Sequence, residues 1–211
     1  MAAVFEEDCL FCSIPKSPRL HTNFEDLPFA ETPSFYAKPA LGHFIEGYTL
    51  IVSKEHYRSF FSLERQKLAE LKLFKEKLTL DLKSIYNSPV IAFEHGCVNP
   101  RKPAGSCIDH AHMHLVPFYT DVHEILKTQF SFELLENLTE LPCCEFQEDS
   151  YIYYESSSGQ SFVFKIDSPI PSQLLRRALC EALNEPDVWD WAIHPFSEKI
   201  QAFIGKYYQC R

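Results

Sequence analysis

The stretch "IDHAHMHLVPF", residues 108–118, places His110, His112 and His114 at alternate positions of an otherwise apolar run. Successive side chains of a β-strand point to opposite faces, so residues two apart share a face. The pattern therefore predicts a strand whose one face carries the three imidazoles, while the other face belongs to the core. The histidine face must meet solvent, a partner, a metal or a substrate. The residues predicted for the core face are Ala111, Met113 and Leu115.

Other segments before residue 120 predict further strands and one long helix. Residues 47–56 predict a strand that leaves the sheet at Ser53, and residues 90–95 predict a second strand, antiparallel to the histidine strand. An amphipathic helix is expected from Ser62, as its N-cap, to Tyr86, since the residue before Pro89 is pushed out of the helical conformation. Its apolar stripe is Leu71, Phe74, Leu78, Leu82 and Ile85.

The segments before residue 35 and after residue 120 have other sequence patterns. The first 34 residues are rich in Pro, Ser and charge and predict surface coil, with ordered structure beginning near Phe35. After residue 120 we expect a hairpin that turns at 155–160, followed by helices at 172–184 and 196–208. This order predicts an α+β fold with an antiparallel sheet and a long amphipathic helix, to which a C-terminal hairpin and helices are added.

Composition and charge narrow the class of protein. Hydrophobic residues make up 45% and charged residues 23%, which is ordinary for a soluble globular protein. The net charge of −9 argues against general binding to nucleic acid polymers or anionic lipid, so any phosphate site must be local. No apolar run approaches the roughly 18 residues that span a bilayer, and the acidic N-terminal residues do not resemble a secretory signal. We expect a cytoplasmic protein.

Three alternating histidines indicate two kinds of chemistry. Imidazole titrates near pH 6.5, so one neutral ring can attack a phosphoryl or nucleotidyl group while a protonated neighbour stabilises the negative oxygens. In the alternative, two or three rings hold zinc and leave one coordination position for water, as in a metal-dependent hydrolase. The pattern by itself leaves both open.

The run from His110 to Val116 also resembles the signature of the histidine triad (HIT) superfamily, in which three histidines alternate with apolar residues. The order of elements agrees, because "CLFC" at residues 9–12, the strand at 47–56 and the long helix precede the triad as they do in HIT proteins. The similarity covers roughly residues 5–120. We therefore expect a HIT-like domain with an N-terminal coil at 1–120, and a C-terminal extension at 121–211 that either packs on it or stays apart.

The resemblance implies a nucleotidyl hydrolase or transferase acting on a nucleoside–phosphate–X substrate. His112 would attack the α-phosphorus and form a covalent nucleotidyl-histidine, which implies net retention at phosphorus. His114 would contact the phosphate oxygens, and His110 would hold His112 in its reactive tautomer. No metal is expected in the chemical step. The expected partners are a nucleotide or nucleotide conjugate and a second copy of the chain, because HIT proteins commonly form homodimers; the extension would occupy that dimer surface in the alternative.

Eight cysteines do not require disulfides in a chain of 211 residues, and only Cys9 and Cys12 have a metal-type spacing. In zinc-containing HIT relatives, two further ligands come from a histidine after the early strand and from the first triad histidine. Here these are His56 and His110. The resemblance thus implies a closed, structural Cys2His2 zinc site that braces the N-terminal segment against the sheet.

The sequence departs from many HIT proteins around the substrate loop. Glu94 and His95, at the end of the strand at 90–95, are unusual replacements, and His95 and Ser106 are candidates for substrate binding. These changes keep open a protein that binds nucleotide as a sensor or scaffold without turnover.

The C-terminal extension offers a second set of candidates. Trp189, Trp191 and His194, with Arg176 and Arg177 upstream, could close over a substrate; aromatic packing in a small core is the simpler interpretation of the tryptophans.

Overall fold

The computed structural model describes residues 9–15, 24–98, 105, 108–145 and 149–210. Its centre is an eight-stranded sheet with the order β1-β2-β3-β5-β4-β7-β8-β6, in which every neighbouring pair is antiparallel. The α+β class predicted from the sequence is confirmed. The strands are β1 (Ala30–Glu31), β2 (Phe35–Pro39), β3 (Thr49–Ser53), β4 (Val90–Gly96), β5 (His112–Pro117), β6 (Phe132–Leu135), β7 (Ser150–Glu155) and β8 (Ser161–Ile166).

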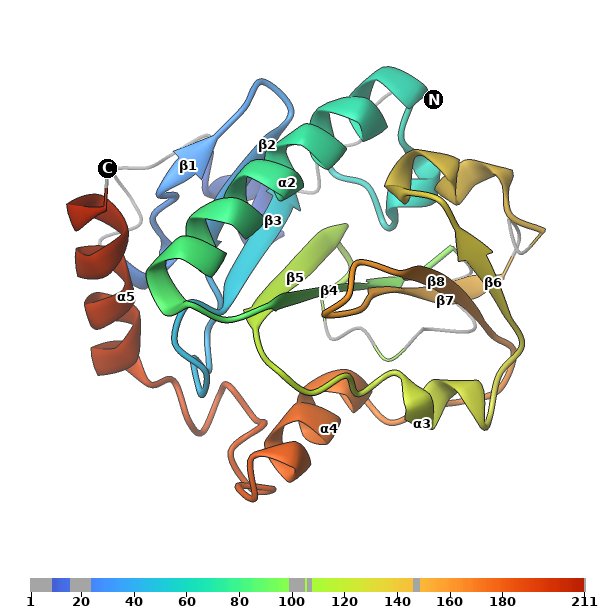
Figure 1. Ribbon diagram of the computed structural model, residues 1–211. Helices are drawn as coiled ribbons and strands as arrows, with labels where there is room; N and C mark the ends of the chain where they lie inside the picture. Colours follow the sequence, from blue (N-terminus) through green and yellow to red (C-terminus); the bar gives the residue numbers. More distant parts are fainter. Residues whose placement is uncertain (1–8, 16–23, 99–104, 106–107, 146–148, 211) are drawn as a thin grey trace.

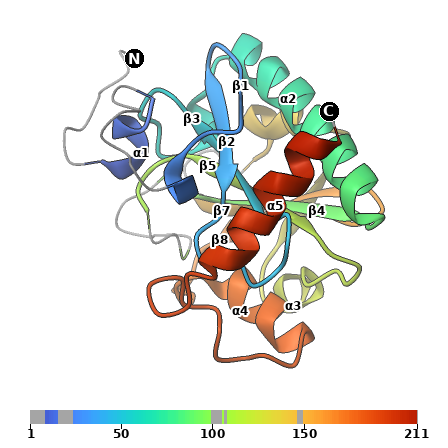
Figure 2. The same cartoon turned by 90° about the vertical axis from the view of Figure 1, so that its left-hand side faces the viewer.

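Helices cover both faces of the sheet, so the molecule has three layers (Figure 1). One face packs against α2, η3 and α5, and Figure 2 shows α5 alongside α2. The opposite face packs against α1, α3 and α4. The helices are α1 (Leu10–Ser13), α2 (Arg65–Tyr86), α3 (Glu124–Lys127), α4 (Leu174–Ala182) and α5 (Ser197–Gln209), with short 3-10 turns η1 (Phe24–Asp26), η2 (Phe60–Ser62) and η3 (Leu138–Cys143).

Strand β5 has the two unlike faces that its sequence predicts. Met113 and Leu115 are fully buried in the core on the α2 side. His112 and His114 lie on the opposite side, each 7% exposed. Hydrogen bonding to β3 and β4 on its two sides fixes the register, because a slip by one residue would exchange the two faces.

The long helix differs slightly from its prediction at the N-terminus. It begins at Arg65 with Glu64 as N-cap, whereas Ser62 belongs to η2. The predicted end is confirmed, since Asn87 adopts the left-handed conformation (φ 48°) two residues before Pro89. Leu71, Phe74, Leu78 and Leu82 of the predicted stripe are buried, and Ile85 packs at its margin.

The segment after residue 120 continues the same sheet. The predicted hairpin is present as β7 and β8, and β7 pairs with β4 over five residue pairs. Hydrogen-bonded strands therefore run across the expected boundary at residue 120, and the division into two domains remains a prediction. The prediction that regular structure begins near Phe35 is wrong, because α1 and β1 lie before that residue. No helix in the described part of the chain is both long and apolar enough to cross a bilayer.

A buried carboxyl joins β4 to its surroundings on the α2 side. Glu94 is 1% exposed; its Oε1 accepts a hydrogen bond from the Phe60 backbone N–H (2.8 Å) and its Oε2 accepts one from the Tyr151 hydroxyl (2.6 Å). Burial raises the pKa of Glu94 to about 8. The group is therefore mostly protonated in the folded protein at pH 7.

We expect Glu94→Gln to flatten the pH dependence of stability. A carboxyl whose pKa is raised by folding stabilises the fold below its ordinary pKa of 4.5, and this contribution is lost as the pH rises through about 8. The loss is at most about 1.4 kcal/mol per pH unit. Glutamine keeps an acceptor for Phe60 and a donor for the Tyr151 oxygen. Urea unfolding at pH 5 and pH 8 measures the effect, and an equal loss of stability in parent and variant would contradict it.

Candidate functional site

A pocket lies on the face of the sheet that α1 and α4 cover, and His112 and His114 form part of its lining. Its apolar wall comes from the N-terminal half of the chain, and its polar wall includes residues of the C-terminal segment. The apolar residues are Leu10, Phe11, Ala40, Leu41, Leu50 and Ile108. The polar residues are Lys38, His95, His112, His114, Gln173 and Arg176; Gly105 and Trp191 complete the lining.

His112 presents one ring nitrogen for chemistry. Its Nδ1 lies 2.7 Å from the carbonyl oxygen of His110, which fixes the tautomer, because only a protonated Nδ1 can donate to a carbonyl. Nε2 is then the atom with a free lone pair, and no described residue hydrogen-bonds to it. Burial lowers the pKa of His112, so the ring is neutral at pH 7. A neutral, oriented imidazole beside a pocket is suited to nucleophilic attack.

His114 is held by aromatic neighbours. Its Nδ1 is 2.8 Å from the Tyr48 hydroxyl, and its ring stacks on Phe93 with centroids 4.4 Å apart. Burial, followed by the proximity of His112, lowers the pKa of His114 well below its ordinary value. This ring is therefore neutral at pH 7, and positive charge at the pocket must come from another side chain.

His110 contacts the cysteines and is not part of the pocket lining formed by His112 and His114. It precedes the first residue of β5, and its ring meets Phe11 at 5.6 Å, on the side of the sheet where Phe11 also meets His112. Nε2 of His110 lies 2.8 Å from the Ser53 carbonyl oxygen and donates to it, whereas Nδ1 lies 3.4 Å from Cys9 Sγ and 3.6 Å from Cys12 Sγ. The unprotonated nitrogen of His110 thus points at the two thiols.

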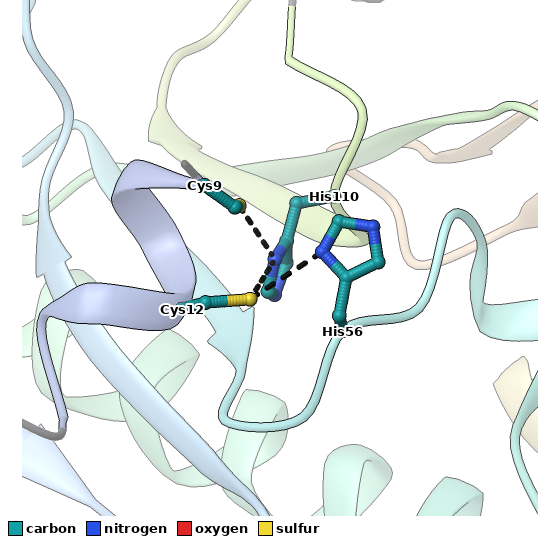
Figure 3. A group of neighbouring side chains, drawn as sticks. All are labelled: Cys9, Cys12, His56 and His110. Atoms are coloured by element: carbon teal, nitrogen blue, oxygen red, sulfur yellow. Dashed lines mark hydrogen bonds between the residues drawn. The ribbon is translucent and has the colours of Figure 1, made fainter. Parts of the chain in front are cut away.

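Four metal-ligating side chains meet beside the pocket (Figure 3). The ligand atoms of Cys9, Cys12, His56 and His110 all lie within 4.8 Å of one another, and His56 Nδ1 is 3.4 Å from Cys12 Sγ. In a tetrahedral zinc site with bonds of 2.0–2.3 Å, neighbouring donors are roughly 3.3–3.8 Å apart. The donor set suits zinc, and the Cys9–His110, Cys12–His56 and Cys12–His110 distances of 3.4, 3.4 and 3.6 Å fall in this range. Four protein ligands would fill such a site and leave no position for water.

The cluster and the pocket share Phe11. This residue belongs to α1, between the two cysteines, and its ring meets His112 edge-on at 5.4 Å. The Tyr36 hydroxyl donates a 2.9 Å hydrogen bond to the Phe11 carbonyl oxygen, which ties α1 to the sheet. Anchoring α1 therefore also fixes one apolar wall of the pocket.

Of the remaining residues around the triad, some lie at the pocket and others lie away from it. His95 lines the pocket, whereas the adjacent Glu94 lies on the α2 side, because neighbouring strand residues point to opposite faces. Ser106 lies outside the described residues. Asp109, which comes directly before the triad, forms an ion pair with Arg58 at 3.1 Å, and both side chains are nearly half-exposed.

The C-terminal segment contributes more to the pocket than its sequence pattern predicted. Gln173 and Arg176, at the start of α4, and Trp191 beyond it all line the pocket. Arg177 instead stacks on Trp189, with its Cζ 3.3 Å from a ring centroid. The only local signal for Arg176 was a charged residue among apolar ones in a predicted amphipathic helix, which does not reveal what the helix packs against.

Comparisons with known proteins gave the following. No family model matches this chain, and no curated protein matches it. Among solved structures it is similar to a HIT family protein from Bacillus anthracis, with 23% identity, a TM-score of 0.44, and 55% of this chain and 76% of that one covered. It is also similar to a hypothetical histidine triad nucleotide-binding protein from Sulfolobus tokodaii, with 24% identity, a TM-score of 0.44, and 54% of this chain and 70% of that one covered. For a HIT family hydrolase from Clostridium thermocellum the identity is 19% and the TM-score is 0.37, with 54% of this chain and 92% of that one covered. The names of all three contain HIT or histidine triad.

Gly42 lies in close contact with Arg176 and Trp191 of the C-terminal segment. A Cβ at Gly42 would lie 2.5 Å from Arg176 Nη2 and 2.6 Å from Trp191 Cβ, and its φ is +64°. We expect Gly42→Ala to lower the free energy of unfolding by about 2–5 kcal/mol, from backbone strain plus overpacking. Gly159→Ala is the matched control, because φ is +86° there and the space is open, so only about 1–2 kcal/mol of strain applies. Denaturant unfolding should separate the two variants, and equal losses would contradict the contact.

Proposed function

We propose that this chain is a HIT-type nucleotidyl hydrolase or transferase that acts on a nucleoside–phosphate–X substrate through His112. The observation that carries the proposal is the 2.7 Å hydrogen bond from His112 Nδ1 to the His110 carbonyl oxygen, because it leaves Nε2 as the nucleophilic atom beside the pocket. Enzymatic activity of this type needs an oriented nucleophile and room for the reacting phosphate, and both requirements are met here.

In the first step, Nε2 of His112 attacks the α-phosphorus as the bond from phosphorus to X breaks, and X leaves with the electron pair of that bond. In the second step, water or another acceptor attacks phosphorus, the P–N bond breaks, and its electrons return to Nε2. The His110 carbonyl stabilises the ring as positive charge develops on it, since the Nδ1–H bond strengthens. His114, held by Tyr48, contacts the phosphate oxygens.

The apolar wall of the pocket supports a substrate with a base and sugar. Phe11, Leu50 and Ile108 offer a surface against which a flat aromatic ring can be buried. This wall meets His112 directly through Phe11, so a nucleoside packed on it would place its 5′-phosphate near Nε2.

Replacement of His112 tests the nucleophile. We expect His112→Asn to lower kcat/KM by about 1000-fold or more and to abolish a mass increase of one nucleotide on the protein. The trials use adenosine 5′-phosphoramidate, dinucleoside polyphosphates and nucleotide sugars, with intact-protein mass spectrometry as the readout. His194→Asn, outside the pocket, should behave as the parent does. A variant at position 112 that turned over substrate at the parent's rate would refute the assignment.

The same experiment distinguishes the alternative functions. A bound, uncleaved nucleotide with no mass increase would favour a sensor or scaffold. A zinc-dependent hydrolase would lose activity at once on chelation and regain it with metal. Because His112 and His114 face the pocket while His110 faces the cysteines, we assign no metal to the chemical step.

We also propose that Cys9, Cys12, His56 and His110 bind one structural zinc ion. When bound, zinc supplies a rigid crosslink between α1, the segment after β3 and the segment before β5. Ser53 supports this role for His110, since its carbonyl oxygen accepts the Nε2 hydrogen and leaves Nδ1 free to bind metal.

Metal content and stability test the zinc site. We expect about one zinc per chain by elemental analysis, and a lower melting temperature after prolonged chelation, because α1 loses its crosslink. Cys12→Ser should lose the metal and melt earlier, whereas Cys143→Ser, an exposed cysteine elsewhere, should retain both metal and stability. Full stability in a metal-free parent would contradict the structural role.

The homodimer implied by the resemblance remains a prediction. Strand β4 is paired with β5 on one side and with β7 on the other. A dimer would therefore have to form through a surface other than the edge of β4.

A further inference from the structure

Two buried cations line the pocket, and only one of them has an acidic partner. Lys38, 1% exposed, forms an ion pair with Asp26 at 3.0 Å. Arg176 is 5% exposed, and no carboxylate lies within ion-pair distance of it in the described part of the chain. A buried charge without a counter-charge is costly, so Arg176 is positioned for an anion that the protein itself does not supply.

The hydrogen bonds of Arg176 leave one end of its guanidinium available. Nε donates to the Trp189 carbonyl oxygen at 3.2 Å, and Nη2 donates to the same oxygen at 3.1 Å and to that of Gly42 at 3.0 Å. These bonds hold the group in place. A guanidinium has five N–H donors, and the two on Nη1 bond to no described residue. A fixed pair of N–H groups on a cation matches a phosphate.

The position of Arg176 links it to the reacting centre. Its Cζ lies 5.2 Å from the centroid of the Tyr48 ring, and the hydroxyl of that ring meets His114 Nδ1 at 2.8 Å. The charge of Arg176 also contributes to the lowered pKa of His114. Arg176 therefore lies on the His114 side of the pocket, whereas Phe11 contacts His112 from α1.

Gln173, three residues before Arg176, is a second polar side chain of the pocket whose hydrogen bonding is incomplete among the described residues. Its side chain lines the pocket and is 9% exposed, and its Oε1 is buried with no hydrogen-bond partner among the described residues. Its backbone is in the left-handed region (φ +58°), where a side chain costs free energy that glycine would avoid. Its N–H donates to the Gly105 carbonyl oxygen at 2.9 Å, which fixes it against the segment before the triad.

We propose that Gln173 and Arg176 form a subsite for the leaving group X, and that X is a phosphate ester bearing hydroxyl groups. Nucleoside diphosphate sugars and dinucleoside polyphosphates share this chemistry, whereas nucleoside phosphoramidates lack it. The inference rests on the proposed function and narrows its substrate class. Arg176 binds the β-phosphate, and the carboxamide of Gln173 accepts a hydrogen bond from a hydroxyl of the group beyond it.

The subsite fits the electron flow of the first step. As Nε2 of His112 bonds to the α-phosphorus, the bridging P–O bond breaks and its electron pair stays on the leaving phosphate. That phosphate gains one negative charge, which the Nη1 donors of Arg176 stabilise without a proton transfer. In the second step one proton of the attacking water passes to solvent, so the ring of His112 is restored.

Binding measurements test the subsite without turnover. In the His112→Asn protein, titration calorimetry with AMP and ADP, and with GMP and GDP, gives the affinity added by a β-phosphate. We expect the diphosphate of the preferred base to bind about 10- to 100-fold more tightly than its monophosphate. Equal affinities, or no binding of either nucleotide, would overturn the subsite.

Substitutions at neighbouring arginines localise the effect. Added to His112→Asn, Arg176→Gln should reduce the diphosphate advantage to about threefold or less, and Arg176→Lys, which keeps the charge but loses the fork, should leave an intermediate value. Arg177→Gln is the matched control and should keep the full advantage, because Arg177 stacks on Trp189 outside the pocket. An advantage unchanged in Arg176→Lys and Arg176→Gln would refute the role of Arg176, and the lysine variant serves if the glutamine variant does not fold.

Gln173→Gly gives a variant that should fold better and bind worse. Removing strain at φ +58° should raise the melting temperature by about 2–4 °C. At the same time the extra affinity of ADP-glucose over ADP should fall by about 3- to 10-fold. Asn184→Gly, at another positive-φ position (+59°) on the surface, controls for the backbone change and should leave affinities alone. Unchanged ADP-glucose affinity in Gln173→Gly would remove Gln173 from the subsite.

Turnover separates this inference from the proposed function. With His112 intact, Arg176→Gln should lower kcat/KM for ADP-glucose and diadenosine tetraphosphate at least tenfold more than for adenosine 5′-phosphoramidate. Equal losses on all substrates would show a structural role for Arg176 and overturn the subsite, while nucleotidyl-His112 would still form. If no substrate labels His112, the proposed function fails, yet a diphosphate advantage that depends on Arg176 would still support the subsite.

Discussion

The pocket depends on the backbone hydrogen bonds that hold β5 between β3 and β4. In this register His112 lies opposite Val52, and His114 lies opposite Leu50 and Phe93. Met113 and Leu115 are then committed to the core beneath α2, and the two histidines are committed to the other face. Burial of the apolar face therefore also positions the two histidines, because a shift of the strand by one residue would exchange both faces together.

The rest of the site is brought to this strand from the two ends of the chain. α1 contributes Phe11 from the N-terminal side, and the start of α4 contributes Gln173 and Arg176 from the C-terminal side. The sheet supplies the nucleophile, α1 an apolar wall and α4 a fixed cation. Each contribution has its own anchor: the cluster with Cys9 and Cys12 for α1, and hydrogen bonds to the Trp189 and Gly42 carbonyls for Arg176.

Local patterns were enough to predict the strands, the long helix and the C-terminal hairpin, because periodicity of two or of three to four residues reflects which face is buried. The same patterns could not show which strands pair. The pairing of β4 with β7 joins residues 55–63 positions apart, and no pattern in either segment identifies its partner. For this reason no local pattern predicted that Glu94 would meet Tyr151, or that α4 would reach the pocket.

The site was predictable to a similar extent. Alternation predicted that His112 and His114 lie together, but it could not show that the His110 ring would meet Cys9, Cys12 and His56, which are far away in the sequence. The C-terminal pattern predicts Trp189, Trp191, His194, Arg176 and Arg177 as residues that could close over a substrate, with packing as the simpler interpretation of the tryptophans; of these, Arg176 and Trp191 line the pocket. Only the three-dimensional contact with Gly42 and Tyr48 distinguishes Arg176, which lines the pocket, from Arg177, which does not.

The pairing of β7 with β4 also has a consequence for truncation of the chain. An interior strand that loses its neighbour presents a row of unsatisfied N–H and C=O groups, which recruits other chains into aggregates. A version of this chain cut near residue 120 would expose that edge of β4. The hairpin of β7 and β8 thus protects β4 from edge-to-edge association with other molecules.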